Sequence, residues 1–141
     1  MSKIVTLIAF FATFLFATPP NFASTHTFEL KKDEWARVFV VEKATQKMDS
    51  FDFRWTLFDT KNINLQTFFR FYPKHVVLGL AHKQDRFVQS IIPAFNQPPQ
   101  DSVKLYLTFL EFKNKRAFFR VDILDPSSRI DTQFIDPPKR N

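Results

Sequence analysis

The chain has no cysteine and only one glycine, Gly79. The missing cysteine excludes disulfides, thiol nucleophiles and thiolate metal ligands. A single glycine excludes the glycine-rich loops that bind nucleotide phosphates, because those loops need several residues without a side chain. Tight turns must instead be formed by Asn, Asp and Pro.

Histidine is scarce as well, with His26, His75 and His82 only. His75 and His82 flank an expected strand and would lie about 20 Å apart if it is extended, too far to share a metal ion. His26 near a free amine is the one alternative ligand for copper or zinc. Asp122 is the one acid within an apolar run, and we expect it to form a surface ion pair with Arg120 or Lys104. No serine lies in a nucleophile-elbow motif. We therefore predict no catalytic residue, no metal site and no cofactor, and the protein is not expected to be an enzyme.

The longest apolar run is short. Lys3 precedes Ile4 to Phe16, which are 13 uncharged and mostly apolar residues, and small residues follow. A membrane-spanning helix needs about 20 such residues. A positive start, a short apolar segment and a small-residue exit are typical of a secretory signal peptide. We predict a cleaved signal peptide over residues 1–23, with Ala17, Ala23 and Ser24 as alternative cleavage points, and no stable membrane span after cleavage.

The remaining residues 24–141 are expected to form a single β domain with a loose C-terminal tail. Cleavage after Ala23 leaves 118 residues (141 minus 23), enough to bury about two-thirds of the unfolded surface without disulfides. The composition, rich in Phe, Lys, Asn and Ile, is typical of AT-rich bacterial genomes. Together with the signal peptide, this predicts a periplasmic or secreted protein.

The positive charge is modest and scattered. The mature chain would carry 19 basic and 14 acidic residues, a net charge of +5. Mixed neighbours such as Lys31, Lys32, Asp33 and Glu34 are typical of a solvated surface. We expect weak attraction to an anionic envelope surface, and no nucleic-acid binding.

Short alternating runs rich in aromatic and β-branched residues predict strands. The only helical pattern lies within Val41 to Asp49. The expected fold is all-β, either a single antiparallel β-sandwich or a small barrel of about eight strands. The expected strands are His26 to Leu30, Trp35 to Glu42, Ser50 to Asp59, Ile63 to Tyr72, Val76 to Ala81, Arg86 to Ile92, Val103 to Lys113, Arg116 to Leu124, and Thr132 to Ile135.

Residues Ser50 to Tyr72 predict a hairpin with Asp59 opposite Ile63. Burial then selects a register in which one face is apolar. This face holds Phe51, Phe53, Trp55, Leu57, Leu65, Phe69 and Phe71. The opposite face is the predicted partner-binding site, because interface centres favour aromatic residues and arginine. Its residues are Arg54, Phe58, Phe68, Arg70 and Tyr72, with Arg70 opposite Asp52.

A second hairpin is expected to turn at Asn114 and Lys115. With Phe112 opposite Ala117, its apolar face comprises Tyr106, Thr108, Leu110, Phe119, Val121 and Ile123. The reverse face is then half apolar. Asp125 to Ser128 predicts a type I turn, and Asn96 to Asp101 predicts an extended loop.

Two functions fit these features. The first is a non-catalytic binding or scaffold module that docks on another cell-envelope protein through an aromatic, arginine-bearing sheet face. The alternative is a small carrier that holds an apolar ligand in a pocket between two sheets or inside a barrel.

Overall fold

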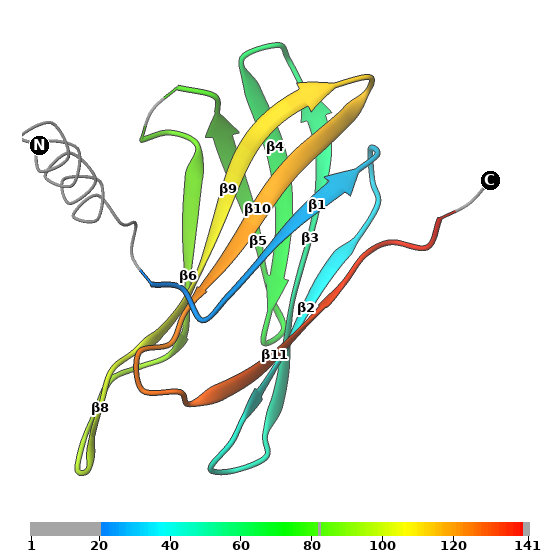
Figure 1. Ribbon diagram of the computed structural model, residues 1–141. Coiled ribbons are helices and arrows are strands. Elements are labelled where there is room, and N and C mark those ends of the chain that lie inside the picture. The colour runs from blue at the N-terminus through cyan, green and yellow to red at the C-terminus, as the bar shows by residue number, and fades with distance from the viewer. Residues whose placement is uncertain (1–20, 82, 140–141) are drawn as a thin grey trace, which may run out of the picture.

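The computed structural model describes residues 21–81 and 83–139 (Figure 1). Most of the expected signal peptide therefore lies outside the described residues. No helix within the described ranges is long and apolar enough to cross a membrane. The strands are β1 (Ser24–Leu30), β2 (Ala36–Glu42), β3 (Met48–Phe58), β4 (Asn62–Phe69), β5 (Tyr72–Gly79), β6 (Arg86–Ile92), β7 (Phe95–Asn96), β8 (Pro99–Gln100), β9 (Val103–Lys113), β10 (Arg116–Leu124) and β11 (Ile130–Ile135).

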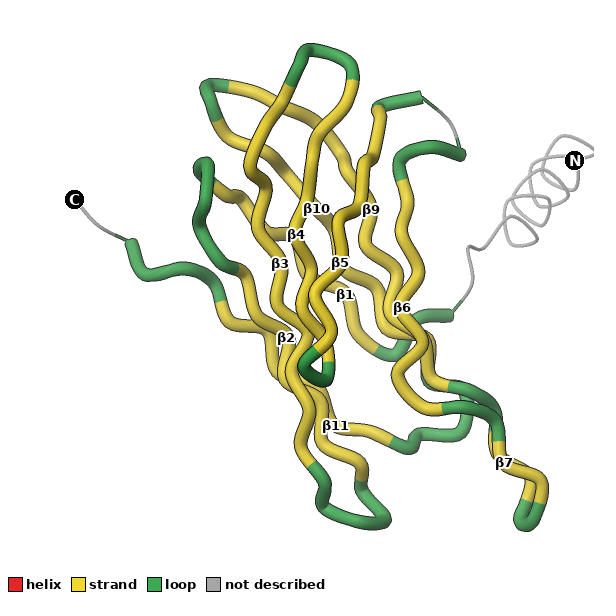
Figure 2. Tube along the Cα trace, turned by 180° about the vertical axis from the view of Figure 1, so that it is seen from behind, coloured by secondary structure: helices red, strands yellow, loops and turns green. Residues whose placement is uncertain are grey.

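All strand pairs are antiparallel and form two main sheets. Sheet A has the order β1-β10-β9-β6, and sheet B has the order β11-β2-β3-β4-β5. The prediction of an all-β fold is confirmed. The sheets do not close into a barrel, and the arrangement is consistent with a β-sandwich (Figures 1 and 2).

Two segments differ from their predicted local structure. The expected loop Asn96 to Asp101 instead contributes to the short β7-β8 hairpin, which projects away from both main sheets (Figure 2). The prediction of helical turns within Val41 to Asp49 is wrong, because the ends of this stretch belong to β2 and β3 and residues 43–47 form the turn between them. Here the backbone amide of Gln46 donates to the carbonyl of Glu42 at 2.8 Å.

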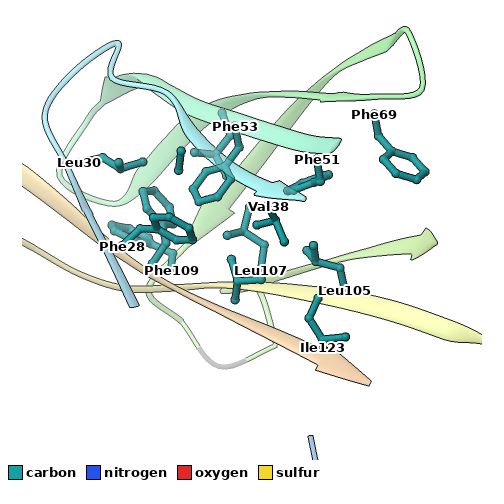
Figure 3. Close-up of a cluster of buried hydrophobic side chains, with 14 of the residues drawn as sticks. Phe28, Leu30, Val38, Phe51, Phe53, Phe69, Leu105, Leu107, Phe109 and Ile123 are labelled. Atoms are coloured by element: carbon teal, nitrogen blue, oxygen red, sulfur yellow. The ribbon is translucent and has the colours of Figure 1, made fainter. Parts of the chain in front are cut away.

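Aromatic rings from both sheets fill the space between them (Figure 3). Phe53 of sheet B meets Phe28 and Phe119 of sheet A edge to face, each with ring centroids 5.5 Å apart. All three side chains are fully buried. Each contributes about 2 to 3 kcal/mol through removal of apolar surface from water. The Trp55 indole donates to the carbonyl of Leu30 at 2.8 Å, so its polar atom is satisfied in the core.

The first hairpin has a register different from the predicted one. Phe51 pairs with Phe69, and Trp55 pairs with Leu65. The turn is one residue shorter than expected, and a bulge at Thr56 shifts the pairing by one further residue, so the total shift is two residues. A shift of two residues keeps each side chain on its face, so the burial predicted for these four residues is confirmed.

Two residues predicted in that core are exposed. Leu57 follows the bulge at Thr56, which reverses the alternation of faces, and 54% of its surface is exposed. Phe71 lies in the two-residue turn between β4 and β5, and it is 90% exposed. Its φ of 66° and that of Arg70, 49°, belong to the left-handed conformation that such tight turns require.

The second hairpin confirms the predicted turn but corrects the predicted face. Asn114 and Lys115 have φ values of 54° and 62°, and Phe112 pairs with Ala117 as expected. A bulge then leaves Leu110 without a partner and places Phe109 opposite Phe119. The residues of β9 that face the core are therefore Leu105, Leu107 and Phe109, and not the predicted Tyr106, Thr108 and Leu110.

Candidate binding surface on sheet B

The outer face of sheet B exposes aromatic and basic side chains. Strand β2 alternates, so that Ala36, Val38 and Val40 are buried while Arg37 and Phe39 face outward. Neighbouring strands continue this surface. We call it the sheet B face, defined as Trp35, Arg37, Phe39, Arg54, Gln66, Phe68, Pro73 and His75.

Arg54 is held in place without an acidic partner. Its guanidinium carbon lies 4.8 Å from the centre of the Trp35 ring, and its Nε donates to Gln66 Oε1 at 2.8 Å. Both contacts order the side chain while leaving its charge unneutralised. Arg54 forms no ion pair within residues 21–81 and 83–139.

Beside this pair lies an open groove of about 410 Å³. Trp35 and Phe68 form its aromatic walls and are 44% and 37% exposed. The other lining residues are Gln66, Thr67, Pro73, Lys74 and His75. The groove therefore combines apolar walls with basic or neutral polar groups.

Arg37 on the same face is neutralised. Its Nε donates to Asp52 Oδ1 at 2.9 Å and its Nη2 donates to Asp52 Oδ2 at 3.2 Å. This hydrogen bonding, reinforced by the negative charge, raises the pKa of Arg37 above its usual value. The guanidinium also lies 5.5 Å from the centre of the Phe39 ring. Arg37 and Asp52 thus form an ion pair in which each neutralises the charge of the other, in contrast to Arg54.

Of the five residues predicted as a binding face, Arg54 and Phe68 lie together on this surface. Phe58 does not, and its predicted outward position is wrong. The bulge at Thr56 turns Phe58 toward the core, where its ring stacks on Phe112 with centroids 4.0 Å apart.

Arg70 and Tyr72 lie at the β4-β5 turn. The predicted pairing of Arg70 with Asp52 is wrong, because the register places Phe68 opposite Asp52. Arg70 instead donates to Asp49 at 3.0 Å and to the carbonyl of Ile91 at 2.8 Å. The second contact ties sheet B to strand β6 of sheet A. Tyr72 is largely exposed at the start of β5.

Sequence reasoning missed Trp35, Arg37, Phe39, Pro73 and His75 as members of this face. The alternation from Trp35 to Glu42 already separates three of them from the buried Ala36, Val38 and Val40. This alternation could therefore have predicted that Trp35, Arg37 and Phe39 lie on the outward side. The position of β2 beside β3 was also needed, since only the pairing brings Trp35 against Arg54.

No group of three or more His, Asp or Glu side chains in the described part of the chain is placed to hold a metal ion. His26 stacks on Phe134 with centroids 5.0 Å apart, and its Nε2 lies 3.0 Å from Asp136 Oδ1. His75 lies on the sheet B face, and His82 falls outside the described residues.

A second groove, of about 510 Å³, lies between β1 and the C-terminal residues. Its lining includes acidic and basic side chains, and Arg116 pairs with Glu29 at 3.1 Å. The charged side chains of this groove therefore partly neutralise one another, whereas Arg54 has no ion pair among the described residues. Comparison with protein-family models, with curated proteins and with solved structures gives no match for this chain.

Proposed function

We propose that this protein is a non-catalytic binding or scaffold module of the periplasm or the secreted fraction, and that it docks on another cell-envelope protein through the sheet B face. One observation carries the proposal. Arg54 is stacked on Trp35 and bound to Gln66, yet it has no carboxylate partner among the described residues. It stands beside the groove walled by Trp35 and Phe68.

This arrangement suits recognition for two physical reasons. Tryptophan, tyrosine and arginine dominate the binding energy of protein interfaces, particularly where they are desolvated together. Arg54 is also ordered before any partner arrives, because two neighbours fix it. An ordered side chain loses less conformational entropy on binding, so more of the contact energy is retained as affinity.

The carrier alternative requires space between the sheets. Ring contacts between Phe53, Phe28 and Phe119 occupy the centre of that space. A pocket lined by Val40, Ile91 and neighbouring residues measures about 10 Å³, roughly the room for a single water molecule. These observations favour the binding module over the carrier.

Affinity capture from chemically crosslinked envelopes tests the proposal. The test variant is Trp35→Ala with Arg54→Ala. Its matched control is Tyr106→Ala with Arg86→Ala, which removes a similar cation-aromatic contact, 5.4 Å long, from sheet A. We expect the wild-type chain and the control to recover the same partner. We expect the test variant to recover about tenfold less, because losing roughly 1.4 kcal/mol of interface energy has that effect.

Two outcomes would overturn the proposal. One is a wild-type chain that recovers no discrete partner under crosslinking. The other is equal recovery by the test variant and the control, since the sheet B face would then have no special role. Native mass spectrometry of the purified protein adds a separate check, because a co-purifying apolar small molecule would support the carrier instead.

A further inference from the structure

Strand β5 forms an open edge of sheet B. It is the last strand in the order β11-β2-β3-β4-β5, and it pairs with β4 only. Most of its side chains are exposed, from Tyr72 to His75 and again at Val77. In the described chain no further strand of sheet B lies beside the outer side of β5 (Figure 2).

One hydrogen bond shows which way the backbone amides of β5 point. The amide of Gly79 donates to the carbonyl of Gln84 at 2.9 Å, away from β4. The β4-β5 register is continuous from Asn62 to Phe69, with no bulge. Amides of an antiparallel strand alternate between its two sides. The amides of His75 and Val77 therefore also point away from β4, toward the open edge. Pro73, near the start of β5, has no amide hydrogen, so it offers no hydrogen-bond donor at the edge, whereas His75 and Val77 do.

The surroundings of this edge are basic. No acidic residue occurs between Thr60 and Gln84, whereas four basic residues do. Arg70 pairs with Asp49, but Lys74 forms no ion pair within the described residues. The Lys74 ammonium instead lies 6.0 Å from the centre of the Phe87 ring. A strand added beside β5 would meet an unneutralised positive charge.

We propose that the partner adds an extended acidic strand to the β5 edge, an inference that rests on the proposed function. Side chains of paired strands alternate between two faces. Acidic residues of the added strand would lie beside Lys74 on one face. Apolar residues would lie beside Pro73 and Val77 on the other, continuing the groove at Phe68. The recognised pattern is thus an alternation of acidic and apolar residues.

Charge disfavours a second copy of the chain as the occupant. An antiparallel β5-β5 pair would bring the acid-free segment of one copy against that of the other. Like charges opposite each other destabilise a strand pair, whereas opposite charges stabilise it. An acidic strand avoids this repulsion.

Two synthetic peptides test the inference. One has 12 residues alternating valine and glutamate, and its counterpart alternates valine and lysine. Amide hydrogen exchange of the full chain is followed by NMR at His75 and Val77. We expect saturating acidic peptide to slow exchange at both amides at least tenfold, and the lysine peptide to leave both unchanged.

Variants of β5 separate backbone pairing from charge. Val77→Pro removes an outward amide but no hydrogen bond to β4, and Val77→Thr is its control. We expect Val77→Pro to weaken binding of the acidic peptide at least tenfold, and Val77→Thr to leave it within twofold. Lys74→Glu should reverse the preference in favour of the lysine peptide, which keeps the test decisive if the proline variant fails to fold.

Three results would overturn the inference. These are unchanged exchange at His75 and Val77 with the acidic peptide, equal slowing by both peptides, or slowing that grows with protein concentration alone, which indicates a second copy. The envelope capture distinguishes the two proposals. If Lys74→Glu and Val77→Pro recover the partner as well as the wild type does, the edge inference fails while the proposed function stands. If the wild type recovers none, the proposed function itself fails.

Discussion

The outer faces of the two sheets differ in how their charges are paired. On sheet A, Asp122 is only 2% exposed, and it accepts hydrogen bonds from Arg120 at 2.9 Å and from Thr25 at 2.7 Å. On sheet B, Arg54 stacks on Trp35 and has no ion pair in the described chain. The buried acid of sheet A is thus neutralised by its own neighbours. Arg54 of sheet B keeps an unneutralised charge, as does Arg86 of sheet A, which forms no ion pair among the described residues.

A similar contrast holds for the aromatic residues. Arg86 lies 5.4 Å from the ring centre of Tyr106 on sheet A, which resembles the Arg54-Trp35 contact. Tyr106, however, is half-buried, whereas Trp35 is 44% exposed. An arginine stacked on an aromatic ring can therefore belong mainly to the fold or remain at the surface, depending on how far the ring is exposed.

The largest expected effect comes from breaking the sheet A network. Asp122→Ala leaves Arg120 and Thr25 without their buried acceptor. Because Arg120 is 38% exposed and can be solvated, we expect the lost hydrogen bonds to the buried carboxylate to lower the free energy of unfolding by about 2 kcal/mol. Arg54→Ala removes a partly exposed cation-aromatic contact and the hydrogen bond to Gln66, and it should cost about 1 kcal/mol. Urea denaturation measures both. A larger loss for Arg54→Ala than for Asp122→Ala would reverse the comparison.

Breaking the Arg37-Asp52 ion pair on sheet B should have an intermediate effect on the free energy of unfolding. Arg37→Ala leaves Asp52, which is 9% exposed, without its bidentate partner. Because Arg37 itself is half exposed, we expect a loss of about 1 kcal/mol in the free energy of unfolding. The double variant Arg37→Ala with Asp52→Ala should recover part of that loss. Strict additivity of the two single changes would show that the pair contributes nothing.

Thr108 provides a smaller test on sheet A. Its hydroxyl oxygen is buried and has no hydrogen-bond partner among the described residues. Replacing an unpaired buried hydroxyl with a methyl group removes a desolvation cost. We expect Thr108→Val to raise the free energy of unfolding by up to about 1 kcal/mol, measured by urea denaturation. Thr132→Val on sheet B is the control. A clear destabilisation by Thr108→Val would indicate that the hydroxyl is satisfied.

The smallest expected effect concerns the β3-β4 turn of sheet B. The amides of Asn62 and Lys61 donate to Asp59 Oδ1 at 2.7 and 3.0 Å, and they lower the pKa of this carboxyl below its usual 3.8. A lowered folded-state pKa stabilises the protein above the unfolded pKa, and this contribution is lost as pH falls through the folded value. Asp59→Asn should therefore show a weaker loss of stability between pH 4 and pH 2. Parallel pH profiles for variant and wild type would contradict this.

Local pattern predicted the strands well because alternation and turn chemistry are short-range properties. The turn at Asn114 and Lys115 and the strand β11 are examples. The bulges at Thr56 and Leu110 were not predictable from alternation. A bulge inserts one residue without changing composition, yet it reverses every face beyond it. This single cause moved Phe58 inward and exchanged the two faces of β9.

The candidate site was predictable only in part for a related reason. Arg54 and Phe68 share one hairpin, so their common face follows from local alternation. Trp35 lies directly before β2, and the β2-β3 register that brings it against Arg54 is not encoded in any turn motif. The pairing partner of a strand depends on the packing of the whole sheet, which composition and periodicity do not specify.

Site-specific photo-crosslinking in the cells that produce the protein tests the difference between the two faces most directly. A photo-reactive amino acid replaces Phe68 on sheet B in one variant and Tyr106 on sheet A in the other. We predict a discrete adduct with a partner protein from position 68 and none from position 106. An adduct from position 106 alone, or from neither position, would contradict the claim that sheet B carries the docking surface.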